Sequence, residues 1–420
     1  MTKQNLFNIS LAFFSVCFIF LWDFNNNLFE IRYLFLLLII PVLFSIYSKL
    51  LKKNYSFFLI ISILILINLF HLTINSTIDG KIISLHNYLS LIFFILIFSI
   101  VYFFHIKIID NLDLIIIIFY IVFFIATLYS IINLTEDVPY FCGGLNNALG
   151  RSVSFTHILF SENSHLGMIA PAVILYSINR IFKKRMSLLF VISTVLFFLI
   201  CYIKSSTTYI SGIILSTFII TIFNYNFIKK KTLIFFSVIV LILTFSFIND
   251  DQCKRRLIPK YSGENLVSQN FTSFTENTFF PNKKQNEEVG GLSSGLFFRS
   301  LMITKHYIIS KPFGWGFNRY DLAFDEYNTI YPPKNSLLKD YNKKDGINNF
   351  NKITVEFGVF SIILYVLIFR YLINREINID EKMFLIPIVI TQLIRGAGYF
   401  NGGFILIILL IVFSYLKKIK

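Results

Sequence analysis

The chain has 420 residues, of which 56% are apolar and 15% charged, whereas a typical soluble domain has about 25% charged residues. This composition excludes an ordinary water-soluble protein. The formal net charge of +15 would suit a nucleic-acid-binding protein, but the basic residues lie mainly between apolar runs, so we expect no nucleic-acid partner.

Apolar runs recur along the whole chain, and each is long enough to cross a hydrocarbon layer about 30 Å thick as a helix. The first run begins at Leu6 and lacks a small-residue cleavage site, so we expect a retained helix and no signal peptide. We predict an all-α, polytopic integral membrane protein with about twelve transmembrane helices. The predicted spans are 6–22, 28–48, 56–74, 87–106, 112–133, 157–179, 186–203, 206–224, 232–249, 351–370, 383–397 and 402–417.

Basic residues are distributed unequally between the two sets of connections. One set, together with the two ends of the chain, holds Lys3, Lys49, Lys52, Lys53, Lys107, Arg180, Lys183, Lys184, Arg185, Lys229, Lys230, Lys231, Arg370, Arg375, Lys382, Lys417, Lys418 and Lys420. The short connections of the other set hold Arg32, Lys81, Arg151, Lys204 and Arg395. The excess predicts that the first set and both termini are cytoplasmic, and Lys107 is a weak exception to the alternation.

The same spans divide the chain into three parts. Residues 1–249 hold predicted helices one to nine, residues 250–348 form a large loop outside the cytoplasm, and residues 349–420 hold helices ten to twelve. A structureless loop of this length is uncommon, so we expect short helices that cover a site in the bundle. Leu296–Ser310 is one such expected helix, and Pro312, Gly314 and Gly316 should end it.

Four cysteines fall in two environments. Cys17 and Cys201 lie inside predicted spans, whereas Cys142 and Cys253 lie on the outer side, where disulfides persist. Either the latter two are bridged or they are unrelated thiols, because sequence cannot give the distance between their Cα atoms.

The sequence has no Gly-rich phosphate loop, no metal-type Cys and His spacing and no Gly-x-Ser-x-Gly elbow, so we predict no metal and no cofactor. It does place ionisable residues at the outer membrane boundary and in the large loop. Charges at the edges of buried helices are costly and by default face a cavity or one another. The candidates are Arg151, His157, Glu162, His165, Lys204, Arg255, Arg256, Arg299, Arg319, Glu356 and Arg395.

Several of these candidates have an alternative, structural role. Glu162 could act as a base or pair with Arg151, eleven residues before it. Arg299 could bind a phosphate through both arms of its guanidinium group or remain a solvated loop charge. Glu356 could be a buried cap or a site residue. Arg255 and Arg256 could simply pair with the acidic residues that precede them.

Three stretches, in this order, resemble the O-antigen polymerase and O-antigen ligase superfamily of bacterial envelope enzymes. The first runs from Gly150 and Arg151 to Phe160–Ser164, with Asn163 where the family has proline. The second runs from Arg299 to Lys311–Phe317 and is similar to an arginine-headed loop helix that ends in Pro-x-Gly-x-Gly. The third, Asn348–Gly358, is similar to an Asn-x(n)-Glu-x-Gly helix entry, and Lys204–Thr207 approximates a Ser-Arg pair.

The resemblance implies a metal-independent glycosyltransferase of lipopolysaccharide biosynthesis in the bacterial inner membrane, with the large loop periplasmic. Its donor would be an undecaprenyl-pyrophosphate-linked oligosaccharide, and a chain-length regulator would be a possible partner. Arg299 and Arg151 would contact the pyrophosphate, with Arg255, Arg256 and Lys204 as further contacts. Glu162 would activate the acceptor or position a cation. The remaining site residues implied are Arg319, His165 and Glu356.

Three functions remain open within this framework. Ligases of the superfamily usually carry a histidine just before the helix that follows the loop, where this chain has Ile347, Asn348 and Asn349, so we favour polymerase. Ligase, with His306 as the substitute histidine, is the alternative. A flippase for lipid-linked oligosaccharide is the third, but we find no repeated halves in the sequence.

Overall fold

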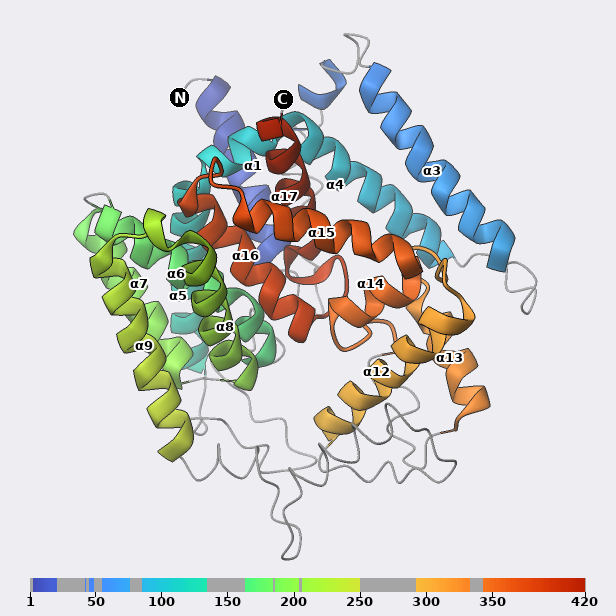
Figure 1. The fold of residues 1–420 in the computed structure, drawn as a ribbon. Coiled ribbons are helices and arrows are strands. Elements are labelled where there is room, and N and C mark those ends of the chain that lie inside the picture. Colours follow the sequence, from blue (N-terminus) through green and yellow to red (C-terminus); the bar gives the residue numbers. More distant parts are fainter. Residues whose placement is uncertain are drawn as a thin grey trace, which may run out of the picture.

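The computed structural model of the chain describes residues 3–20, 42, 45–48, 55–75, 85–133, 163–183, 186–203, 206–249, 292–332 and 343–419. Every regular element within these ranges is a helix, which confirms the all-α prediction for this part of the chain. Most of the helices pack into a bundle, and both chain termini lie at the same end of it (Figure 1).

The α-helices, in chain order, are α1 (Lys3–Phe20), α3 (Tyr55–Asn75), α4 (Leu85–Asp110), α5 (Leu112–Asn133), α6 (Asn163–Lys183), α7 (Leu188–Ile203), α8 (Thr207–Asn224), α9 (Lys230–Asn249), α12 (Leu292–Ser310), α13 (Tyr320–Ile330), α14 (Asn349–Phe357), α15 (Ser361–Ile373), α16 (Ile379–Ile394) and α17 (Phe404–Ile419). Short 3₁₀ turns are η1 (Tyr225–Phe227), η3 (Gly358–Phe360) and η4 (Asn401–Gly403).

Each predicted span other than 28–48 overlaps at least one of these helices, and 28–48 lies largely outside the described residues. Among the described residues, five helical segments are long and apolar enough to cross a membrane. They are Ser90–Asp110, Ser164–Lys183, Thr208–Phe227, Asn349–Ile373 and Asn401–Lys418. The chain is therefore a helical membrane protein by length and composition of its helices.

Helices α6, α8 and α16 form the centre of the bundle, and α6 is buried along most of its length. Two glycines allow this close approach. A Cβ at Gly167 would lie 2.9 Å from the backbone nitrogen of Tyr209, and a Cβ at Gly212 would overlap Thr391. Small residues at such crossings bring helix backbones together where no hydrophobic effect drives association. Thr391 also donates a hydrogen bond of 2.6 Å to the carbonyl of Met168, which joins α16 to α6.

The peripheral helices turn large apolar side chains outward. Leu66 on α3, Leu241 on α9 and Ile363 on α15 are each at least 60% exposed. A soluble monomer rarely exposes contiguous apolar surface of this kind, whereas hydrocarbon tails would cover it. The outward faces of these helices are consistent with contact to lipid.

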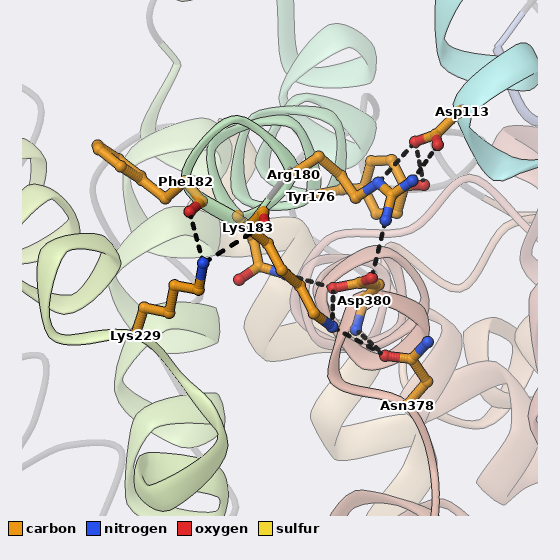
Figure 2. Close-up of polar contacts among 9 residues, drawn as sticks. Asp113, Tyr176, Arg180, Phe182, Lys183, Lys229, Asn378 and Asp380 are labelled. Carbon is orange, nitrogen blue, oxygen red and sulfur yellow. Dashed lines mark hydrogen bonds and ion pairs between the residues drawn. The ribbon is translucent and has the colours of Figure 1, made fainter. Parts of the chain in front are cut away.

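A buried network of charged side chains joins α5, α6 and α16 (Figure 2). Arg180 donates through Nε to Asp113 at 2.8 Å, forms a close ion pair with the same carboxylate, and reaches Asp380 at 3.1 Å. Asp380 also accepts hydrogen bonds from Asn179 at 2.6 Å and from Lys183 at 3.1 Å. Because each carboxylate has more than one donor, these buried charges are compensated.

The network marks one end of the bundle. It contains the last turn of α6 and the first turns of α5 and α16. Nearby, Lys382 donates to Asn224 at 2.6 Å and Lys229 donates to the carbonyl of Phe182 at 2.9 Å. The connections α4–α5, α6–α7, α8–α9 and α15–α16 therefore gather at this end, together with Arg180, Lys183, Lys229 and Lys382, four of the basic residues expected in the cytoplasm.

The predicted span 351–370 is not one continuous helix. The chain breaks at Gly358, which has φ of +54°, between α14 and α15. A Cβ at Gly358 would overlap the carbonyl of Pro312, so the close passage of another segment requires glycine here. The predicted span therefore falls within the candidate membrane span Asn349–Ile373, and the break inside it is a feature that an apolar run does not reveal.

Candidate functional site

The loop that follows α12 docks on the C-terminal half of α14. Trp315 donates its backbone N–H to the carbonyl of Val355 at 3.1 Å, and Gly316 donates to Glu356 at 2.7 Å. Val359 returns a bond of 2.8 Å to the carbonyl of Pro312. The second and third family-like stretches, separate in the sequence, thus form one unit, and α12 ends at Ser310 as predicted.

Two glycines of this loop occupy positions that a side chain would obstruct. Gly314 has φ of +82°, and its Cβ would overlap the carbonyl of Glu356. Gly316 has φ of +97°, and its Cβ would lie 2.8 Å from Cβ of His71 on α3. The Pro-x-Gly-x-Gly pattern therefore has a packing role, because only glycine combines positive φ with such close approach.

Further contacts hold the loop on the bundle. The His71 ring nitrogen Nε2 lies 3.0 Å from the carbonyl oxygen of Phe313. Asn318 donates to Ser90 of α4 at 3.0 Å, and the Phe317 ring stacks on Tyr399, before α17, at 5.4 Å. The α12–α14 unit therefore touches α3, α4 and the connection between α16 and α17. This end of the bundle is opposite the charged network of Figure 2, because it contains the start of α4 and the end of α16.

Glu356 lies at the centre of the unit and is fully buried. Its Oε2 accepts the backbone N–H of Asn318 at 2.7 Å, and its Oε1 accepts that of Tyr320 at 3.0 Å. Lys352 pairs with it at 3.2 Å. A carboxylate that receives the N–H groups at the start of α13 stabilises that helix. These contacts give Glu356 the cap role that the sequence left open.

Arg299 is buried on α12 and holds α13 against it. Its Nε donates to Oδ1 of Asn328 at 3.0 Å, and its Nη2 donates to the carbonyl of Tyr331 at 2.7 Å. The guanidinium carbon lies 5.3 Å from the centre of the Tyr327 ring. Arg299 is therefore not a solvated loop charge, and these contacts join α12 to α13.

Arg319 precedes α13 and is only 6% exposed. Within the described residues its guanidinium group has no hydrogen bond or ion pair, although the carboxylates of Glu356 and Asp321 are near enough to favour its charged form. Burial lowers the pKa of Arg319 from its ordinary value. A buried cation without a direct partner is costly, so the arrangement suits an anionic ligand.

Lys352 links this unit to a second group of charged residues. Its ammonium group donates to the carbonyl of Lys344 at 2.6 Å and to Oδ1 of Asn318 at 3.3 Å, and it lies 5.0 Å from the centre of the Tyr399 ring. With Glu356 as its ion-pair partner, this 2% exposed lysine is fully engaged. It brings positive charge to the turn that holds Asp345.

Asp345 lies in the turn before α14 and is partly exposed. Its Oδ1 is 3.1 Å from the position that a Cβ on Gly398 would take, so it packs on the connection after α16. Burial raises the pKa of the Asp345 carboxyl group, and four neighbouring basic residues oppose this effect. They are Lys352, His165, Arg395 and Lys344.

The site residues predicted from sequence are only partly described. His165 lies in the first turn of α6, half-buried, within electrostatic reach of Asp345. Arg299, Arg319 and Glu356 lie together in the α12–α14 unit. The residues Arg151, His157, Glu162, Lys204, Arg255 and Arg256 lie outside the described residues, as do Cys142 and Cys253.

Sequence reasoning missed Asp345 and Lys352. The turn signal of Asp345 followed by Gly346, just before the N-cap residue Asn348, was available but indicates only a turn. The spacing of Lys352 and Glu356, four residues apart on one helix, is typical of an ion pair.

Among the described residues, no three His, Cys, Asp or Glu side chains come together as metal ligands. Comparison with protein-family models, with curated proteins and with solved structures finds no match to this chain.

Proposed function

We propose that this chain is an O-antigen polymerase, a metal-independent glycosyltransferase of the bacterial inner membrane. It would transfer a glycan from an undecaprenyl-pyrophosphate carrier to a lipid-linked repeat unit at the periplasmic face. The observation that carries the proposal is the docked α12–α14 unit, in which two separate family-like stretches form one structure around Arg319, which is buried and has no ion-pair partner among the described residues.

The chemistry of such a transfer matches the charges of this unit. A lipid diphosphate leaving group gains negative charge as the bond to the sugar breaks, and fixed cations stabilise that charge. Arg319 would contact the diphosphate directly. Arg299 would hold α13 in place and add positive charge to the same site. Arg151, Arg255, Arg256 and Lys204, which lie outside the described residues, would add further positive charge.

The proposed topology has twelve spans, cytoplasmic termini and a periplasmic loop over residues 250–348. The arrangement of charges supports it. The connections that carry Arg180, Lys183, Lys229 and Lys382 gather at one end of the bundle, whereas the α12–α14 unit lies at the other. An excess of basic residues on one side is the signature of the cytoplasmic face.

Ligase is the second candidate, and one observation favours it. His306 on α12 lies 5.6 Å from the Tyr327 ring and 5.9 Å from the Tyr331 ring, measured between centroids. The same two tyrosines contact Arg299. A histidine is thus present beside the arginine of the loop, although on a different element from the one expected in ligases.

A deletion strain distinguishes the candidates. Loss of a polymerase should leave single lipid-linked repeats at the periplasmic face, whereas loss of a ligase should leave long chains on the carrier. Loss of a flippase should trap repeats in the cytoplasm. Complementation by wild type but not by Arg319→Ala, with both proteins present at equal levels in the membrane, would support the proposed site. Full complementation by Arg319→Ala would remove it.

A further inference from the structure

The turn at residues 343–348 is held unusually firmly for a connection between helices. The carbonyl of Lys344 accepts a bond of 2.6 Å from Lys352, and that of Gly346 accepts one of 2.6 Å from Ser300. The carbonyl of Ile347 accepts the N–H of Gly396 at 2.9 Å. Three different elements, α12, α14 and the connection after α16, therefore fix the backbone on both sides of Asp345.

Ile347 adds a backbone conformation that needs this support. Its φ is +65°, a value that a β-branched residue rarely adopts, and the preceding Gly346 has φ of +66°. Such conformations are strained and persist only where surrounding contacts enforce them. The turn therefore presents the Asp345 side chain in a defined direction.

Several basic residues surround the Asp345 carboxylate, but none of the described residues is a direct hydrogen-bond partner. Lys344, Lys352 of α14, His165 of α6 and Arg395 at the end of α16 all favour its ionised form, yet in the described part of the chain none donates a hydrogen bond to it. The lack of a side chain at Gly398 leaves the space beside Oδ1 of Asp345 open, because a Cβ at residue 398 would lie only 3.1 Å from that oxygen. No described donor therefore occupies the lone pairs of the carboxylate, which could accept a hydrogen bond from a ligand hydroxyl group.

We propose that Asp345 is the general base that accepts the proton of the acceptor hydroxyl group in the glycan transfer. The inference rests on the proposed function. As the O–H proton moves to the Asp345 carboxylate, the acceptor oxygen bonds to the anomeric carbon of the donor. The bond from that carbon to the diphosphate oxygen breaks, its electron pair leaves on the lipid diphosphate, and the proton later passes to water.

The charge environment fits this role. A base works best when its pKa approaches the working pH, and burial moves the pKa of Asp345 upward from the ordinary value. The neighbouring basic residues oppose this rise, because positive charge beside the carboxylate favours its ionised form. Because the base must be deprotonated, the transfer rate should fall as pH falls through a pKa that lies above the ordinary range for aspartate.

The test measures kcat and KM for polymerisation of a purified lipid-linked repeat by the full-length protein in vesicles, across pH 5 to 9. Asp345→Asn should lower kcat by about 10²–10⁴-fold and remove the acid limb of the profile, with a smaller effect on KM. Asp345→Glu should keep an acid limb. The matched control is Asp325→Asn, because Asp325 is an exposed carboxylate that pairs with Lys343 at 2.7 Å.

Several results would overturn the inference. Asp345→Asn with kcat within about threefold of wild type, or loss of the acid limb in Glu162→Gln instead, would assign the base elsewhere. If Asp345→Asn fails to fold, a wild-type rate that is independent of pH from 5 to 8 excludes the role. If wild type makes no polymer from the repeat, the proposed function itself fails.

Discussion

Replacing Arg180 by Met should destabilise the bundle, because this side chain is the common partner of two carboxylates on different helices. Arg180 is 7% exposed and joins Asp113 of α5 to Asp380 of α16. Methionine keeps much of the volume and removes the charge. The two carboxylates would then remain at the crossing of the helices without the cation between them (Figure 2).

The expected cost follows from the exposure of each partner. Removing one member of a buried pair typically costs about 3–5 kcal/mol. The Asp113 side chain is 34% exposed, so water would partly replace the lost contact. Asp380 is 10% exposed but keeps Asn179 at 2.6 Å and Lys183 at 3.1 Å. We therefore expect Arg180→Met to lower the free energy of unfolding by about 2–3 kcal/mol.

The assay is unfolding of the purified protein in mixed micelles by increasing sodium dodecyl sulfate, followed by far-ultraviolet circular dichroism. Lys183→Met is the matched control, because Lys183 is 36% exposed and contacts only one of the two carboxylates. Its loss should cost less than about 1 kcal/mol. Adding Asp113→Asn to Arg180→Met should recover part of the lost stability, since it removes an uncompensated charge.

Stability of Arg180→Met within about 0.5 kcal/mol of wild type would refute this reasoning, because it would mean that the carboxylates do not depend on the guanidinium group. A larger loss in Lys183→Met than in Arg180→Met would refute it equally. Additive effects in the double variant would show that Arg180 and Asp113 are not coupled.

Three further changes test the other end of the bundle. Gly358→Ala should release the loop 311–319 from α14, because a Cβ at residue 358 would overlap the carbonyl of Pro312. Hydrogen exchange of the backbone N–H groups of Trp315 and Gly316 should then be faster. Unchanged exchange would contradict the docking of the loop on α14. Glu356→Gln should cost about 1–3 kcal/mol in the same unfolding assay, because it leaves Lys352 without its carboxylate, and a neutral effect would argue against the cap. Asp345→Asn should raise the free energy of unfolding at pH 7 to 8, because a raised folded-state pKa means that the ionised aspartate destabilises the folded protein above that pKa. The gain should vanish below about pH 4, where the aspartate is protonated in both states. A loss of stability at neutral pH would contradict the direction of the pKa shift.

Hydropathy predicted most helices of the described chain, because a long apolar run has few alternatives in a membrane. Pro312, Gly314 and Gly316 predicted where α12 ends, because proline and glycine interrupt a helix through their own backbone preferences. The break at Gly358 was missed because Val359, Phe360 and the residues after them continue the apolar pattern. Its cause is the passage of Pro312, a contact between segments far apart in the chain.

The site was less predictable for the same reason. Sequence singled out Arg299 as the main pyrophosphate contact and Arg319 only as a further site residue. In the structure Arg299 is bound to Asn328 and Tyr331, whereas Arg319 has no hydrogen-bond or ion-pair partner among the described residues. Such differences depend on tertiary contacts. Arg180 was predicted as a cytoplasmic marker, and its partners on α5 and α16 are separated from it by 67 and 200 residues.

The most direct measurement is incubation of the purified wild-type protein in vesicles with a lipid-linked repeat unit, followed by separation of the products by size. We expect a ladder of lipid-linked polymers, which Arg319→Met should abolish and Arg375→Met, at an exposed arginine beyond α15, should not. A ladder of equal intensity from Arg319→Met would contradict the role of this cation. No ladder from wild type would contradict the polymerase.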